Sequence, residues 1–102
     1  MVFMSAEQTT VLLKGKVSIP DGVLVRELQG ESVLLNLNTE SYFGLDDVGT
    51  RMWAALTGSA SVEAAYEMLL AEYEVDAARL RADLHGFIEK LKEMGLIELS
   101  DV

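Results

Sequence analysis

The sequence predicts a small α+β domain in which a three-stranded antiparallel sheet is followed by three helices. Runs rich in Val, Leu, Tyr and Phe are separated by turn residues up to residue 45, and apolar residues then recur at helical spacing. The chain has 102 residues, half of them apolar, which suits a single domain with a folded core. We expect a flexible N-terminal segment over residues 1–15, the domain over 16–99 and a tail over 100–102.

Three apolar runs predict the strands of an antiparallel meander, and they span residues 23–28, 32–37 and 42–45. The first run alternates and follows the turn signal Pro20-Asp21-Gly22. Before that turn, residues 16–19 predict a short strand that shields the edge of the first run. The second run is apolar at nearly every position, which is typical of a strand covered on both faces and paired along both edges.

Three amphipathic helices are predicted after the strands. The first begins after the N-cap candidate Asp46 and ends at Gly58, and the second covers residues 62–73. The third begins near Asp76 and ends at Gly95, a residue type that commonly follows the last turn of a helix.

Composition and charge argue against several classes of function. The 17 acidic and 8 basic side chains give a net charge of −9, which disfavours a protein that neutralises nucleic-acid phosphates. The chain has no cysteine, so disulfides, thiolate metal sites and cysteine nucleophiles are excluded. No apolar stretch is long enough to span a membrane, and the N-terminus does not resemble a secretory signal. We therefore expect a cytoplasmic protein.

The residues offer no recognisable catalytic or metal-binding set. His85 is the only histidine, and no partner base or nucleophile accompanies it on the polar side of the third helix. The carboxylates Asp46-Asp47 and those from Glu72 to Asp76 lie at helix starts or connections, where capping and solvation explain them. The sequence therefore predicts a protein that is not an enzyme and that binds no metal or cofactor.

The third strand, Tyr42-Phe43-Gly44-Leu45, lacks the lysines, prolines and inward charges that usually protect the edge of a sheet. Such an edge is either covered by the helices or open to an extended peptide, which would bind through main-chain hydrogen bonds. Gly44 has no side chain, so a second backbone can approach closely there. The pattern alone leaves both interpretations open.

The third helix is the candidate for a second wall beside that strand. Its apolar stripe includes Leu80, Leu84 and Phe87 and fits either a core face or a groove. Arg79 and Asp83 flank the stripe, where they either orient a peptide through charge-assisted bonds or form a solvated face. The interior residue Gly86 costs about 1 kcal/mol relative to alanine, which hints at close packing or at a ligand passing nearby.

Residues 33–53 resemble the PqqD superfamily, whose pattern is an apolar strand, a turn, a Tyr-Phe strand, then Leu-Asp and a helix with a tryptophan, here Trp53. The resemblance covers about residues 16–99. Within the superfamily, residues 18–23 and 25–28 are most similar to the stand-alone leader-binding proteins of lasso peptide biosynthesis.

This resemblance implies a winged helix-turn-helix-like fold that binds the leader segment of a ribosomally made precursor peptide. The leader would join the third strand as an added strand, in a groove shared with the third helix. The residues implied are the main chain of Tyr42, Phe43, Gly44 and Leu45 and the side chains of Arg79, Leu80, Asp83, Leu84 and Phe87. A separate cysteine protease would then remove the leader, and a separate cyclase would close the ring.

Three other functions remain open: a peptide chaperone of the PqqD type for a radical-SAM or other modifying enzyme, a winged-helix DNA-binding regulator, and a structural subunit. DNA binding is disfavoured because the third helix balances four basic residues with four acidic ones, namely Arg79, Arg81, Lys90 and Lys92 against Asp76, Asp83, Glu89 and Glu93. The dependence of affinity on salt distinguishes DNA binding from peptide binding. Affinity for DNA falls steeply as the salt concentration rises, whereas affinity for a peptide added as a strand changes little.

Overall fold

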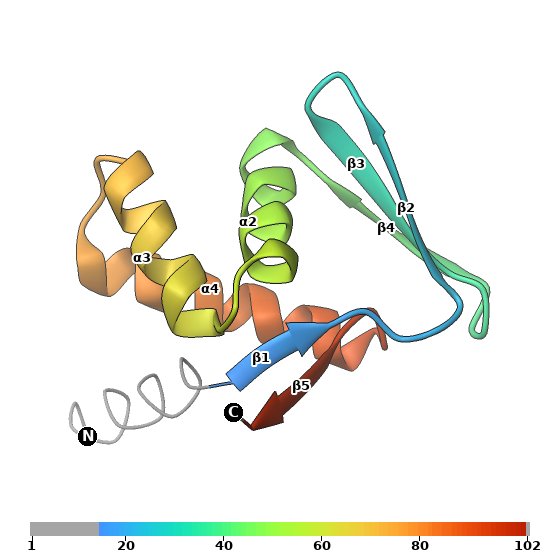
Figure 1. Cartoon of the computed structure of the whole chain (residues 1–102). Helices are drawn as coiled ribbons and strands as arrows, with labels where there is room; N and C mark the ends of the chain where they lie inside the picture. Colours follow the sequence, from blue (N-terminus) through green and yellow to red (C-terminus); the bar gives the residue numbers. More distant parts are fainter. Residues whose placement is uncertain (1–14, 102) are drawn as a thin grey trace.

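The computed structural model describes residues 15–101 and has a three-stranded antiparallel sheet standing beside a group of three helices (Figure 1). The expected N-terminal segment, apart from Gly15, and Val102 lie outside the described residues. In chain order the elements are β1 (Gly15–Ser18), β2 (Val23–Leu28), β3 (Glu31–Asn36), β4 (Ser41–Leu45), α2 (Asp47–Gly58), α3 (Val62–Glu72), α4 (Ala77–Glu93) and β5 (Glu98–Asp101). The predicted α+β class and the strands-then-helices order are confirmed.

The sheet has the strand order β2-β3-β4, with both pairs antiparallel. Strands β2 and β3 are joined by the two-residue turn Gln29-Gly30, and both residues have positive φ angles, 54° and 85°. This is the signature of the tight hairpin turns whose twist matches that of the flanking strands. The predicted meander is therefore confirmed, with β4 at one edge of the sheet.

A second, two-stranded sheet is formed by β1 and β5, which pair antiparallel with Val17 opposite Leu99. The expectation that residues 16–19 shield the edge of β2 is therefore wrong. The partner of β1 is the C-terminal strand, and β5 continues past residue 99 as far as Asp101. Sequence pattern could not reveal this pairing, because the paired residues lie eighty or more positions apart in the chain.

Within residues 15–101, the three-stranded sheet is covered on one face only, which corrects the expectation for the second apolar run. In β3, Ser32, Leu34 and Asn36 point toward the helices and are buried, whereas Val33 points outward and is 38% exposed. The helices lie on one side of this sheet in Figure 1. The uncovered outer face is apolar all the same, with exposed Leu24, Leu28, Val33, Leu37 and Tyr42.

Side chains cap each helix where the sequence places a capping residue. The Asp46 carboxylate accepts a hydrogen bond from the Gly49 amide at 2.8 Å, and Ser61 caps α3 in the same way. Asp76 caps α4 through the Arg79 amide at 3.1 Å. These caps explain why the helices begin where they do.

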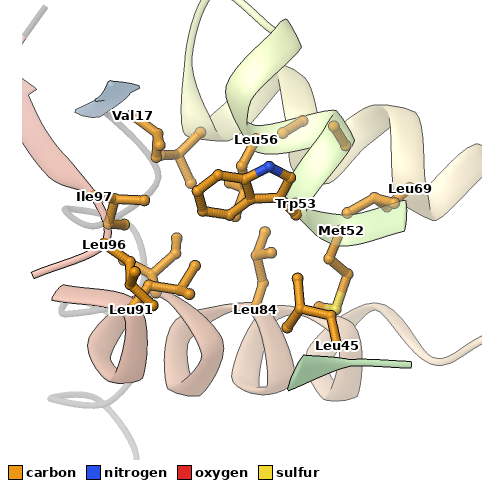
Figure 2. Close-up of a cluster of buried hydrophobic side chains, with 14 of the residues drawn as sticks. Val17, Leu45, Met52, Trp53, Leu56, Leu69, Leu84, Leu91, Leu96 and Ile97 are labelled. Carbon is orange, nitrogen blue, oxygen red and sulfur yellow. The ribbon is translucent and has the colours of Figure 1, made fainter. Parts of the chain in front are cut away.

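The core lies between the helices, the inner face of the sheet and the β1–β5 pair. Trp53 is 5% exposed and lies at the centre of the cluster in Figure 2, where Leu84 and Leu91 from α4 lie below it and Val17 and Ile97 lie to one side. None of the described helices is long and apolar enough to cross a membrane.

Asn36 fixes the sheet relative to α4. Its amide nitrogen donates to the carbonyl oxygens of Met94 and Gly95 at 3.1 and 3.2 Å. Its amide oxygen accepts from the main-chain amides of Asn38 and Thr39 at 3.0 and 3.3 Å. The side chain is 4% exposed and satisfied at both ends, so it holds β3 at the C-terminal end of α4.

Candidate functional site

The free edge of β4 is defined by the hydrogen-bond pattern of the sheet. In an antiparallel pair, residues that exchange main-chain hydrogen bonds alternate with residues that do not. The Leu37 amide donates to the Gly22 carbonyl at 2.8 Å, so the odd-numbered residues of β3 bond to β2. The even-numbered residues of β3 therefore bond to β4, where their partners are Ser41, Phe43 and Leu45.

It follows that Tyr42 and Gly44 direct their N–H and C=O groups away from β3. No other strand among the described residues pairs with β4 on that side. Tyr42 and Gly44 therefore provide two main-chain donors and two acceptors along an edge of the sheet. These are the groups that an additional strand needs for pairing.

A groove of about 590 Å³ runs beside this edge, between β4 and α4. Its apolar surface comes from both walls: Phe43 and Leu45 on β4, and Phe87 on α4. Met52 and Val48 of α2 complete it. The groove thus places an apolar surface directly next to the free main-chain groups, so a strand on β4 would direct alternate side chains into it.

The charged residues that line the groove are both acidic. Asp46 caps α2, so its carboxylate is committed to a main-chain amide. Asp83 lies on α4 and pairs with Arg79 at 3.9 Å, with both side chains largely exposed to solvent. At such exposure the pair contributes little stability, so both groups remain available to a ligand.

The structure brings together five of the nine candidate residues: Phe43, Gly44, Leu45, Asp83 and Phe87 line the groove. Tyr42 lies next to them but points outward, with 72% of its surface exposed, and Arg79 lies beside Asp83 on the exposed side of α4. Leu80 and Leu84 are core residues, at 7% and 0% exposure. Of the two interpretations of the apolar stripe, the core applies to these two leucines and the groove wall to Phe87.

Sequence reasoning missed the contribution of α2 to the groove, which comes from its N-cap Asp46 and from Val48, Gly49 and Met52. The sequence shows only that Val48 belongs to the apolar stripe of its helix, and the structure shows that this side chain is 48% exposed. Spacing alone cannot separate a buried position from one at the margin of the stripe, so the role of α2 in the groove becomes visible only with the fold.

Outside the groove, the polar residues of interest are potential metal ligands and an ion pair. Among the described residues no group of three or more histidines, cysteines or carboxylates could hold a metal ion. His85 does not line the groove and is partly buried, contrary to the solvated position expected for it. Glu72 accepts two hydrogen bonds from Arg51, each 2.7 Å long, and these bonds hold the pKa of Glu72 below its usual range.

Comparison with known proteins gives one family and two similar structures. The family model for coenzyme PQQ synthesis protein D (PqqD) matches residues 31–97. TbiB1 in complex with the TbiA(beta) leader peptide is 38% identical, with a TM-score of 0.74, and the match covers 79% of this chain and 94% of that one.

A second solved structure, lasso peptide synthetase B1 complexed with the leader peptide, is 23% identical and has a TM-score of 0.73. The match covers 81% of this chain and 98% of that one. At this identity, the likeness shows the fold alone. No curated protein matches the chain.

Proposed function

Because the chain belongs to the PqqD family, we propose that it binds the leader segment of a ribosomally made precursor peptide and presents it to a processing enzyme. The observation that carries this proposal is the free edge at Tyr42 and Gly44, which lies directly beside an apolar groove. Main-chain groups supply affinity for any extended segment, and the groove supplies selectivity for its side chains.

Binding occurs by addition of a strand to β4. The added segment exchanges hydrogen bonds with the N–H and C=O groups of Tyr42 and Gly44. Its residues opposite Phe43 and Leu45 point into the groove, toward Phe87 and Met52. Arg79 and Asp83 lie at the margin of the groove. They contact polar groups of the peptide where its chain leaves the groove.

The proposed role is delivery, not catalysis. A bound leader tethers its precursor to any enzyme that also binds this protein, which raises the local concentration of substrate. Residues 18–23 and 25–28 resemble the stand-alone leader-binding proteins of lasso peptide biosynthesis, so the recipients we propose are a separate cysteine protease and a cyclase. We place this step in the cytoplasm, where ribosomally made precursors are first available.

Amide hydrogen exchange tests the proposal, with the TbiA(beta) leader peptide as the probe. In the free protein, the amides of Phe43 and Leu45 are protected by β3, whereas those of Tyr42 and Gly44 exchange quickly. Saturating peptide is expected to protect Tyr42 and Gly44 and to leave the protection of Phe43 nearly unchanged. A complex that leaves Tyr42 and Gly44 exchanging at their free rates would contradict strand addition.

Salt distinguishes this function from DNA binding. Strand addition to an apolar groove predicts that the peptide affinity changes less than about threefold between 50 and 200 mM salt. A protein that contacts several phosphates would lose affinity for duplex DNA by orders of magnitude over the same range. Tight, salt-dependent binding of DNA with no binding of peptide would favour the regulator instead.

A further inference from the structure

A buried pair of hydroxyl groups joins the three-stranded sheet to the first turns of α2. The Oγ atom of Ser32 on β3 lies 2.8 Å from the Oγ1 atom of Thr50 on α2. The two residues are 4% and 7% exposed, so the hydrogen bond between them is shielded from solvent. Buried polar groups of this kind are costly unless they are paired, and here each hydroxyl satisfies the other.

A second contact sets the direction of these hydrogen bonds. The Thr50 hydroxyl also lies 3.5 Å from the carbonyl oxygen of Leu45, which can only accept. Thr50 therefore donates to Leu45 and accepts from Ser32. Leu45 is the residue of β4 that pairs with Ser32 across the sheet. The two bonds thus hold β3, the end of β4 and α2 together at one point.

The same turn of α2 approaches the end of β4 closely. A Cβ atom built on Gly49 would lie 3.3 Å from the Asp46 carboxylate oxygen and 3.3 Å from a side-chain carbon of Leu45. A larger residue would press on both neighbours, so glycine lets the helix lie this near to the strand. The close approach at Gly49 and the hydroxyl bonds of Thr50 therefore fix adjacent residues of α2.

This turn also carries one wall of the groove. Three residues of α2 that line the groove lie within two positions of Thr50, namely Val48, Gly49 and Met52. A shift or rotation of α2 against the sheet would move these side chains relative to Phe43 on β4. Apolar contacts are non-directional, whereas a hydrogen bond requires a particular distance and angle. The buried hydroxyl pair therefore favours one orientation of the wall.

We propose that Ser32 and Thr50 are positioning residues for the groove, which hold α2 in the orientation that receives the peptide. Neither residue lines the groove, so both act through Val48 and Met52 rather than by contact with the peptide. The proposal rests on the proposed function, because the orientation of this wall affects binding only if a peptide occupies the groove.

Removal of one hydroxyl or of both distinguishes positioning from stability, with the TbiA(beta) leader peptide as the probe. Thr50→Val keeps the shape of the side chain but leaves the Ser32 hydroxyl buried and unpaired, so stability and affinity should both fall. Ser32→Ala combined with Thr50→Val removes both polar groups, so stability should return most of the way to that of the wild type. Affinity should remain about fivefold below wild type, because α2 then adopts the binding orientation for only about one fifth of the time.

Two control variants are matched to this pair. Thr57→Val removes a hydroxyl from the other end of α2, where it donates to the Trp53 carbonyl at 2.8 Å within the helix. Because Thr57 does not line the groove, its replacement should leave the affinity unchanged. Thr50→Ser retains the hydroxyl and should retain the affinity of the wild type.

Isothermal titration calorimetry measures the affinity of each variant, and urea denaturation measures its stability. A double variant that regains wild-type affinity together with its stability would overturn the positioning role, since the hydroxyl pair would then serve the fold alone. A wild-type protein that does not bind the peptide would count against the proposed function instead.

A measurement without peptide tests the positioning role by itself. Helix shifts take place in microseconds to milliseconds, so relaxation dispersion of the free double variant should detect exchange at the amides of Val48 and Gly49. The wild type and Thr57→Val should show no such exchange at these two amides. Equal dispersion profiles in the double variant and the wild type would also overturn the proposal.

Discussion

Gly86 shows how the fold changes the meaning of a single residue. It lies inside α4, and its cost to the helix suggested either close packing or a nearby ligand. A Cβ atom built there meets no heavy atom within 4 Å, so close packing among the described residues is excluded. Gly86 also does not line the groove beside β4, so the proposed peptide site does not require it.

We therefore expect Gly86→Ala to raise the free energy of unfolding by about 1 kcal/mol, since alanine is the better helix former and has room here. Urea denaturation followed by the fluorescence of Trp53 measures this change. Peptide affinity should stay the same, so the variant also serves as a stabilised background for weaker mutants. A destabilised Gly86→Ala would mean that another part of the chain packs against this position.

Arg51 and Glu72 join α2 to α3 through two hydrogen bonds that have nearly ideal lengths. The bonds lower the pKa of the Glu72 carboxyl and raise that of the Arg51 guanidinium. Because the pKa of Glu72 is lower in the folded protein, its ionised form stabilises the fold at neutral pH. That contribution disappears as the pH falls through the lowered pKa.

Replacing Arg51 by methionine should return the pKa of Glu72 toward its ordinary value, because the donor of both hydrogen bonds is removed. Carboxyl chemical shifts recorded through a pH titration measure the pKa in both proteins. Arg79→Met provides the control, since Arg79 contacts Asp83 and does not contact Glu72. An unchanged pKa of Glu72 in Arg51→Met would show that the contact does not persist in solution.

At the scale of elements, strands and helices follow the sequence pattern closely. The turns at Pro20 to Gly22 and at Asn38 to Glu40 separate the predicted strands, and Asp46 and Asp76 cap the predicted helices. Turn and capping residues determine where these elements begin and end, so a single sequence is enough to predict them. Whether the outer face of β3 is covered depends on where the helices dock, and an apolar run carries no information on that point.

The alternation of hydrogen bonds along β4 leads to a sharp prediction for proline. Tyr42→Pro removes an N–H that points away from the sheet, so it should cost less than about 1 kcal/mol of stability. Phe43→Pro removes a donor to β3 and a partly buried ring, and should cost more than about 2 kcal/mol. Chemical denaturation compares the two variants.

The variants Tyr42→Pro and Phe43→Pro also distinguish a loss of peptide binding from a loss of stability. Tyr42→Pro should fold normally and lose most of its affinity for the leader peptide, since one of the two free donors is missing. Isothermal titration calorimetry measures that loss, with Leu37→Ala as a folded control, since Leu37 is exposed and does not line the groove. Full affinity in Tyr42→Pro would place the peptide elsewhere on the molecule.

At the scale of the whole molecule, the groove depends on long-range contacts that no local pattern reveals. Its walls, β4 and α4, lie about forty residues apart in the chain and are set relative to each other partly through Asn36. In the sequence, Asn36 is one polar residue at the end of an apolar run. Its four hydrogen bonds, like the pairing of β1 with β5, appear only in the assembled fold.

Asn36→Asp should destabilise the protein by about 3 kcal/mol at pH 7, because a buried carboxylate would face the carbonyl oxygens of Met94 and Gly95. Burial raises the pKa of such a carboxyl in the folded state, so the loss should shrink as the pH falls and the acid becomes protonated. Urea denaturation at pH 7 and pH 4 measures both effects. Asn36→Ala should lose stability with little dependence on pH.

The alternating orientation of the β4 main chain also restricts how a guest can slide. A segment shifted by one residue would direct its own N–H and C=O groups away from β4, and rotating it to restore these bonds would turn every side chain to the opposite face. Only shifts by two residues preserve the bonds, and each such shift moves a different side chain into each position of the groove. A peptide bound in the wrong register therefore loses contacts at every position at once. A short motif is thus enough to fix the point at which the rest of the precursor leaves the groove.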